Sequence, residues 1–164
     1  MSAEIQFYDS VDPGKIPASA THAALYHDGL YAATPAQAKR FPHVHWITVT
    51  GNDTCGIADY EPGNEVYDKA GALRAYVSGR HKRMSRAVVY SDRSNIESAL
   101  KELDGRGCHW WIATLDNKRW TAQELAKDLK DNFGVTVKAS DIWANQYAGG
   151  QGAEYDTSDL LGNW

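Results

Sequence analysis

Apolar segments typical of β-strands alternate with segments typical of helices along almost the whole chain of 164 residues. This alternation restricts the fold more than any other feature, because strands separated by helices favour a mainly parallel sheet with helices packed outside it. Eight segments have the apolar character of strands: residues 5–9, 23–26, 44–49, 56–61, 87–90, 110–114, 141–144 and 154–157.

Eight such strands predict a closed barrel of the TIM-like (β/α)₈ class, which usually needs ~200–250 residues. At 164 residues the chain is shorter. Several helices must therefore be missing, notably after the first and third strands, and we expect a shortened, irregular α/β barrel. An open doubly wound sheet is the alternative. No linker or repeat divides the chain, so residues 1–164 are expected to form a single domain.

Four helices are expected, over residues 36–40, 65–77, 95–103 and 122–133. Each follows a residue type that often caps a helix N-terminus: Thr34, Asn64, Ser94 and Thr121. Glu124 is placed to complete a capping box with Thr121, and Gly134 is placed to end the last helix.

Composition argues against several classes of partner. The net charge of −4 gives no electrostatic footprint for nucleic acid. No apolar run approaches the length of a membrane span, and residues 1–5 have neither the basic nor the apolar part of a secretion signal. We therefore expect a protein made in the cytoplasm without a signal peptide, with no nucleic-acid or membrane partner and no cofactor.

Two smaller features complete the survey. Cys55 and Cys108 are far apart and each opens an apolar segment, so free buried thiols are expected, with a disulfide as the alternative. The basic run 80–83 with Arg86 is expected to be a solvated helix end, because cations suit helix C-termini.

Two carboxylates, Asp59 and Glu61, stand two residues apart at the end of the fourth strand, just before Pro62 and Gly63. Residues i and i+2 of a strand face the same side, ~6–7 Å apart along it. Like charges this close raise one pKa, so one carboxyl can stay protonated beside an ionised one. Glycoside hydrolysis uses such a pair. The alternative is an ordinary strand end with two solvated acids.

Other polar side chains occupy the ends of other strands, where parallel α/β folds place their functional groups. Asp9 ends the first strand, Tyr90 ends the fifth, Gln146 follows the seventh and Asp156 lies on the eighth. The first and eighth strands of a closed barrel are neighbours. We therefore expect Asp9 and Asp156 to lie together and to face the other two acids.

Aromatic residues close to carboxylates suit sugars, because the C–H faces of a pyranose stack on Trp and Tyr. Tyr90, Trp111 and Trp143 are candidates for this contact. Each has an equally good interpretation as a core residue, since Trp and Tyr on strands are often buried.

Six of these segments occur in an order that resembles a known family. They are residues 7–10 (FYDS), 59–61 (DYE), 89–91 (VYS), 111–113 (WIA), 143–147 (WANQY) and 155–158 (YDTS). The chain resembles the lysozyme-type barrel of glycoside hydrolase family 25. It is most similar to the shortened glycoside-hydrolase-like group (DUF1906) of actinobacteria and their phages.

The resemblance implies a muramidase-like enzyme that hydrolyses the β-1,4 bond after N-acetylmuramic acid in peptidoglycan. It implies that Glu61 is the proton donor and that Asp9, Asp59 and Asp156 complete the acidic site. It also implies action on the cell wall, after holin-type release as an endolysin or within a phage particle. Tyr90, Trp111, Trp143 and Gln146 are the expected substrate contacts. The chain departs from the family at Thr114-Leu115, where members often carry an aromatic residue.

Two other functions remain open. One is a catalytically silent barrel that acts as a phage structural or cell-wall-binding module. The other is a metallohydrolase that uses His43 and His45, whose i, i+2 spacing allows a shared metal. That pair is expected at the start of its strand, away from the acids, which disfavours the metal hypothesis.

Overall fold

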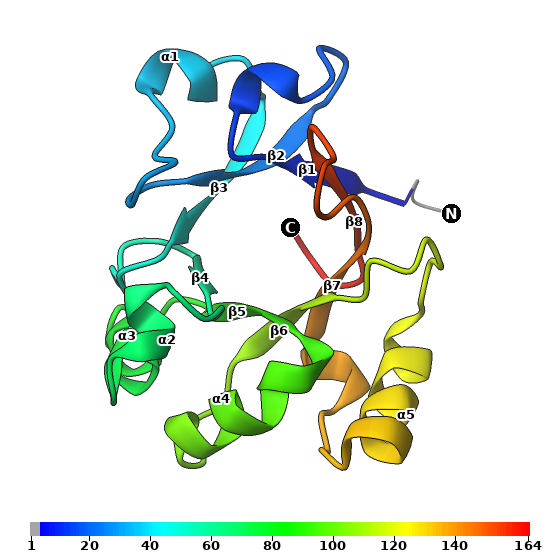
Figure 1. The fold of residues 1–164 in the computed structure, drawn as a ribbon. Coiled ribbons are helices and arrows are strands. Elements are labelled where there is room, and N and C mark those ends of the chain that lie inside the picture. The colour runs from blue at the N-terminus through cyan, green and yellow to red at the C-terminus, as the bar shows by residue number, and fades with distance from the viewer. Residues whose placement is uncertain (1–3) are drawn as a thin grey trace.

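The computed structural model describes residues 4–164 and is a mixed α/β protein built around a closed barrel of eight strands. The strands follow one another around the barrel in chain order (Figure 1). The predicted eight-stranded barrel is therefore confirmed in place of the open sheet. The strands are β1 Gln6–Asp9, β2 His22–Tyr26, β3 His43–Thr48, β4 Ile57–Asp59, β5 Val88–Asp92, β6 His109–Ala113, β7 Ile142–Ala148 and β8 Asp156–Leu160.

The last strand runs against the others. Each of the strands β1 to β6 pairs in parallel with its successor, whereas β8 is antiparallel to both β7 and β1. The reason is the short connection, residues 149–155, because a parallel crossover needs about a dozen residues or more. The expectation of a fully parallel barrel is wrong for this strand, which also begins two residues later than predicted.

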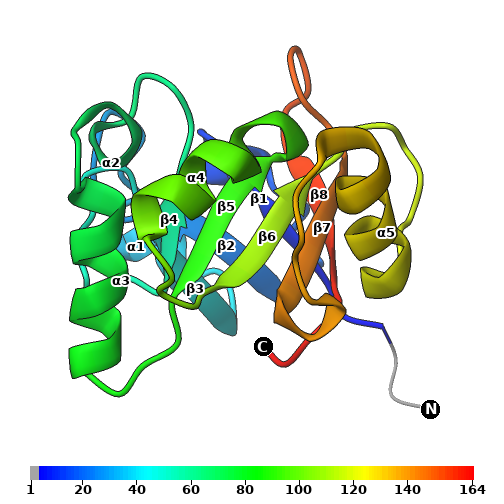
Figure 2. The same cartoon turned by 90° about the horizontal axis from the view of Figure 1, so that it is seen from below.

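Helices lie outside the barrel and follow only some of the strands (Figures 1 and 2). Within residues 4–164, the chain between β3 and β4 forms only turns, and a single 3₁₀ turn, Pro13–Lys15, follows β1. These are the places where missing helices were predicted. The α-helices are α1 Pro35–Ala38, α2 Glu65–Asp68, α3 Ala72–Lys82, α4 Ile96–Leu103 and α5 Ala122–Phe133.

Two of the predicted helix starts are confirmed. Thr34 caps α1 and exchanges hydrogen bonds with Gln37, and Thr121 does the same with Glu124 at the start of α5. Gly134 ends α5 in the left-handed conformation, with φ of 69°. These local signals worked because each cap satisfies backbone N–H groups that the first turn of a helix leaves unpaired.

Asn64 occupies the N-cap position of α2 as predicted, but the length of the helix after it and the cap before α4 need correction. The long helix expected after Asn64 is two helices, α2 and α3, because Gly71 adopts a φ of 80° and breaks it. Ser94 is not a helix cap. Asp92 caps a 3₁₀ turn before α4 instead, accepting a hydrogen bond of 3.0 Å from the backbone N–H of Asn95.

Buried apolar residues form an inner and an outer layer, because successive side chains of a strand face opposite sides. The outer layer packs the helices against β4 to β7 and includes Val89, Ile112, Leu73, Leu103 and Leu125. The inner layer fills the barrel with Phe7, Ala24, Ile47, Ile57, Val88, Trp111, Trp143 and Ala144.

The two cysteines are buried and free, as predicted. None of the helices within residues 4–164 has the length and apolar character needed to cross a lipid bilayer.

Candidate active site at the carboxyl ends of the strands

Strand alternation brings the predicted acids into the barrel. Phe7 packs inside the barrel and Tyr8 outside, so Asp9 is directed inward at the end of β1. Ile57 and Asp59 are related in the same way on β4. β4 ends at Asp59, so Glu61 lies just beyond the strand; its charge acts on both Asp9 and Asp59, which places Glu61 beside them. The two carboxylates therefore share a side, as predicted.

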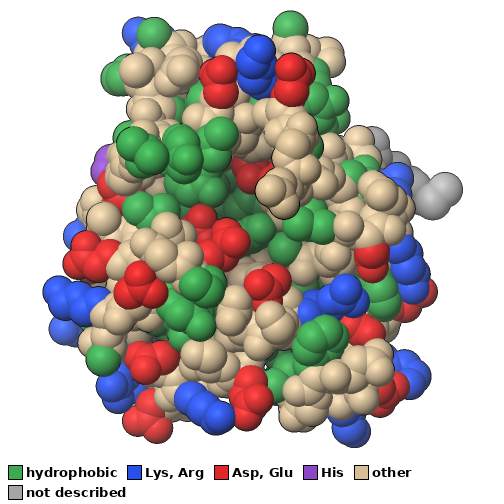
Figure 3. Space-filling model, in the orientation of Figure 1, with side chains coloured by type: hydrophobic (Ala, Val, Ile, Leu, Met, Phe, Trp, Pro, Cys, Tyr) green, Lys and Arg blue, Asp and Glu red, His purple; other side chains and the backbone are tan. Residues whose placement is uncertain are grey.

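Asp156 reaches the same end for a reason that the sequence did not reveal. It is the first residue of an antiparallel strand, and its Cα is paired with that of Asp9 across β1 and β8. We call Asp9, Asp59, Glu61 and Asp156 the acid cluster. Figure 3 shows acidic side chains gathered in a hollow at the centre of this face, with hydrophobic side chains around them.

Gln146 joins the two acids on one side of the cluster. Its side-chain amide is almost fully buried and donates to Asp9 Oδ1 at 3.0 Å and to Asp156 Oδ2 at 3.3 Å. Its carbonyl oxygen accepts a hydrogen bond of 2.7 Å from the hydroxyl of Tyr90. The backbone N–H of Gly150 also donates to Asp156. Gln146 and Tyr90 therefore hold the acids in place from within the barrel.

The other two acids lie on β4 and just beyond it. Asp59 is buried, and its Oδ2 accepts a hydrogen bond of 3.1 Å from the hydroxyl of Tyr26. Asp59 Oδ1 is also buried and has no hydrogen-bond partner within residues 4–164. Glu61 is only partly buried. Tyr26 was not predicted as a site residue, although its position at the end of β2 matches that of Asp9 on β1.

Burial and mutual repulsion make the inner carboxyls weak acids. Burial, followed by the charge of Asp156, raises the pKa of Asp9 to about 8. Burial, followed by the charge of Glu61, raises the pKa of Asp59 well above its usual range. Burial also raises the pKa of Asp156. A proton on Asp59 would remove a buried negative charge, which is costly when one of its oxygens has no hydrogen-bond partner.

The sequence suggested that Asp59 is ionised and that Glu61 holds the proton. In the structure, Asp59 is the more buried of the two, and Glu61 is one of the charges that raise its pKa. Burial therefore favours the protonated form of Asp59. The partly exposed Glu61 is the member that a ligand can reach.

The predicted aromatic contacts are divided between the two ends of the barrel. Tyr90 and Trp111 border the cluster with ring centroids 4.7 Å apart, and the Trp111 indole N–H donates to Ser158 at 3.0 Å. Trp143 lies elsewhere. It is buried near the amino ends of the strands, three residues before Gln146, and its indole N–H donates to the carbonyl of Asn163. The structure therefore does not bring Trp143 to the acids.

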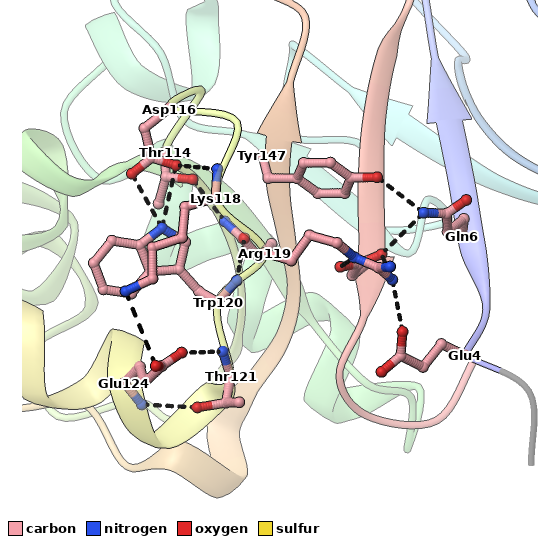
Figure 4. Close-up of polar contacts among 12 residues, drawn as sticks. Glu4, Gln6, Thr114, Asp116, Lys118, Arg119, Trp120, Thr121, Glu124 and Tyr147 are labelled. Atoms are coloured by element: carbon pink, nitrogen blue, oxygen red, sulfur yellow. Dashed lines mark hydrogen bonds and ion pairs between the residues drawn. The ribbon is translucent and has the colours of Figure 1, made fainter. Parts of the chain in front are cut away.

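The hollow beside the acids is narrow, with essentially no volume open to a water molecule, and is lined by Asp9, Asp59, Tyr26, Tyr90, Trp111 and Ile47. A larger groove of about 580 Å³ lies outside the barrel near α5 and β8. Its charged groups are already paired, because Arg119 forms two hydrogen bonds with Asp159 and one with Glu4 (Figure 4). We therefore place the candidate chemistry at the smaller hollow, where no carboxylate of the acid cluster forms an ion pair with another side chain of residues 4–164.

Within residues 4–164, no group of three His, Cys, Asp or Glu side chains, the acid cluster included, is arranged so that it could hold a metal ion. His43 begins β3 and His45 lies near Trp143, so both are at the end of the barrel opposite the acid cluster. In comparisons with known proteins, the chain matches no family model, no curated protein and no solved structure.

Proposed function

We propose that the protein is a glycoside hydrolase of the lysozyme type that cleaves peptidoglycan or a related N-acetylated glycan. The observation that carries this proposal is the convergence of four carboxyl groups, three with raised pKa values, at one end of the barrel. Glycosidases need a proton donor beside an ionised carboxylate, and this cluster supplies both. We also propose that the barrel is a shortened, irregular relative of the (β/α)₈ class.

Glu61 is the general acid in this proposal because it is the accessible member of its pair. Asp59 lies behind Glu61 and supplies the proton that Glu61 passes to the glycosidic oxygen. Tyr26 orients Asp59 through its hydroxyl. The proton ends on the leaving hydroxyl group. A water molecule then adds to the anomeric carbon, and the proton that it loses restores the protonated pair.

Asp156 and Asp9 act on the other side of the reacting sugar. Asp156 is half-exposed and can stabilise the developing positive charge, or orient the substrate's acetamido group as an internal nucleophile. Asp9 and Gln146 are buried behind it and hold its position.

The rim of this end is unusually apolar. Large hydrophobic side chains are exposed on the loops that follow β1, β2 and β6: Val11, Leu30, Tyr31 and Leu115. Tyr31 also lies close to Tyr26, with ring centroids 6.4 Å apart. Apolar side chains around a polar centre suit a sugar chain, whose C–H faces need apolar contact while its hydroxyls need polar contact.

One observation favours the alternative of a silent wall-binding module. The hollow has essentially no volume open to a water molecule, whereas ligand pockets typically have ~300–1,000 Å³. A glycan would therefore have to lie across the rim, with only one group reaching the acids.

The test is release of reducing ends from purified peptidoglycan, including walls of actinobacteria, with mass spectrometry to identify the bond cleaved. Glu61→Gln keeps the shape of Glu61 but cannot donate the proton, so activity should fall by ~10²–10⁴-fold. Glu65→Gln is the matched control, because Glu65 is exposed on α2. Equal activity of Glu61→Gln and wild type would remove Glu61 as the acid. Wall binding without cleavage by wild type would favour the binding module.

A further inference from the structure

The opposite end of the barrel carries a basic pocket that the proposed glycosidase does not use. We call it the base pocket; it has a volume of about 210 Å³, and its walls include His45, Gly56, Arg80, Arg86, Val88 and Trp143. These residues lie at or near the amino ends of β3, β4, β5 and β7 and on α3. The sequence suggested that Arg80 and Arg86 belong to a solvated helix end. Both are instead partly buried.

The two guanidinium groups have no acidic partner. Within residues 4–164, the hydrogen bonds of Arg80 and Arg86 all go to backbone carbonyls. Arg80 Nη2 donates none of them. By contrast, the neighbouring Arg83 pairs with Asp53 at 2.9 Å. Two partly buried cations without a carboxylate are costly unless another anion completes the site.

A third nitrogen group shares this space. His45 Nε2 is buried without a hydrogen-bond partner in the described part of the chain. Gly56 marks where the groups meet, because a Cβ added there would lie 3.7 Å from His45 Nδ1 and 4.0 Å from Arg80 Nη2. Arg86 approaches from the other wall, 5.3 Å from the centre of the Trp143 ring. Because Gly56 has no side chain, it leaves a space beside the nitrogen atoms of His45 and Arg80.

The electrostatic environment of His45 agrees with this geometry. Burial, followed by the positive charges of Arg86, His22 and Arg80, lowers the pKa of His45 to about 4. These groups come from α3, from β2 and from the chain before β5. The local potential is therefore positive in a protein whose net charge is −4. An anion entering the pocket would interact favourably with the guanidinium groups of Arg80 and Arg86.

We propose that the base pocket binds a tetrahedral oxyanion of the phosphate type. Guanidinium groups bind phosphate oxygens with paired hydrogen bonds, and two of them match a doubly charged ion better than a single carboxylate. The volume suits one phosphoryl group with a short attached chain, since it is smaller than pockets for drug-sized ligands. The phosphoryl group can be free phosphate or part of a larger molecule.

Calorimetric titration of the full chain at constant ionic strength tests this proposal, with inorganic phosphate, glycerol phosphate and a dialkyl phosphate as separate probes. Wild type should bind phosphate saturably. Arg86→Gln should weaken binding by about tenfold, the usual effect of losing one charged hydrogen bond. Gly56→Ala keeps every charge but occupies the space, and should weaken binding similarly. Arg83→Gln removes a nearby charge outside the pocket and should stay within about twofold of wild type.

The results distinguish free phosphate from a phosphoryl group on a larger molecule, and specific binding from general charge attraction. Tighter binding of glycerol phosphate than of inorganic phosphate would assign the site to a phosphoryl group on a larger molecule, and the reverse order to the free ion. Absence of saturable binding would overturn the proposal. Equal effects of Arg86→Gln and Arg83→Gln, with Gly56→Ala unaffected, would also overturn it, because only general charge attraction would remain. Thermal melts of each variant without phosphate identify any loss that arises from unfolding.

Discussion

The buried carboxyl of Asp9 links the candidate site to the stability of the fold. A buried carboxylate without a cation is costly, so the folded protein retains a proton that the unfolded chain releases. The hydrogen bond from Gln146 offsets part of this cost. The buried carboxyl of Asp9 therefore lowers the stability of the fold. Such a cost is typical of residues that have a chemical role.

This argument predicts a specific pH dependence. The folded pKa of Asp9 is about 8, against an ordinary value of 3.8. Between these values the folded protein binds more protons than the unfolded chain, so its free energy of unfolding falls as pH rises. Asp9→Asn removes this ionisation and should flatten the slope by up to about 1.4 kcal/mol per pH unit. Urea unfolding from pH 4 to pH 8 measures the slope, and parallel curves for variant and wild type would contradict the prediction.

The turn between β7 and β8 is the element that delivers Asp156 to the cluster. Gly149 has a φ of 119°, and a Cβ placed there would lie 2.8 Å from the Asp156 Cα. Gly150 donates a hydrogen bond to the same carboxylate. The strand therefore begins where it does because two glycines allow the chain to pass close to Asp156.

Gly149→Ala should displace the start of β8 and destabilise the protein by about 1–3 kcal/mol more than Gly152→Ala, the usual cost of overpacking. Gly152 is the matched control, because it has a φ of 86° in the same turn but no atom within 4 Å of an added Cβ. Chemical unfolding of the two variants side by side gives the difference. If both variants lose the same free energy of unfolding, the close packing of Gly149 against Asp156 does not contribute to stability.

Local signals in the sequence predicted where helices and strands begin better than they predicted how these elements contact one another. Thr34 and Thr121 could be identified as caps because a cap depends on residues three positions apart. The break at Gly71 was missed because the apolar spacing continues across it. Asp9, Asp59 and Glu61 could be placed because alternation along a strand fixes the side they face.

What could not be predicted depends on contacts between distant parts of the chain. Asp156 reaches the cluster through an antiparallel strand, which follows from the length of a connection rather than from the strand's own residues. Trp143 lies at the other end because its depth in the barrel depends on the register of β7, which contains irregularities on both sides. Gln146 was predicted as a substrate contact, and only the structure reveals its role between Asp9 and Asp156.

At the scale of the whole molecule, the two ends of the barrel have opposite character. The acid cluster lies at the carboxyl ends of the parallel strands, and the base pocket lies at the amino ends. The apolar inner layer between them, including Phe7, Ile57 and Trp111, separates the two sets of charges. The basic groups therefore lie far from the acid cluster. The central claim is that, without nearby cations, carboxyl groups of the acid cluster stay protonated at neutral pH, and that this happens at the acid-cluster end of the barrel only.

Carbon-detected NMR titration of all aspartate and glutamate side chains tests that claim most directly, because it reports the protonation of each carboxyl in the intact protein. Burial should place the pKa of Asp9 near 8, and should raise the pKa values of Asp59 and Asp156. Hydrogen bonds from Thr48 and its neighbours should keep the pKa of Asp28 below its ordinary value despite partial burial. Titration of Asp9 and Asp59 near pH 4, with the other carboxyls, would contradict the claim and remove the physical basis of the proposed site.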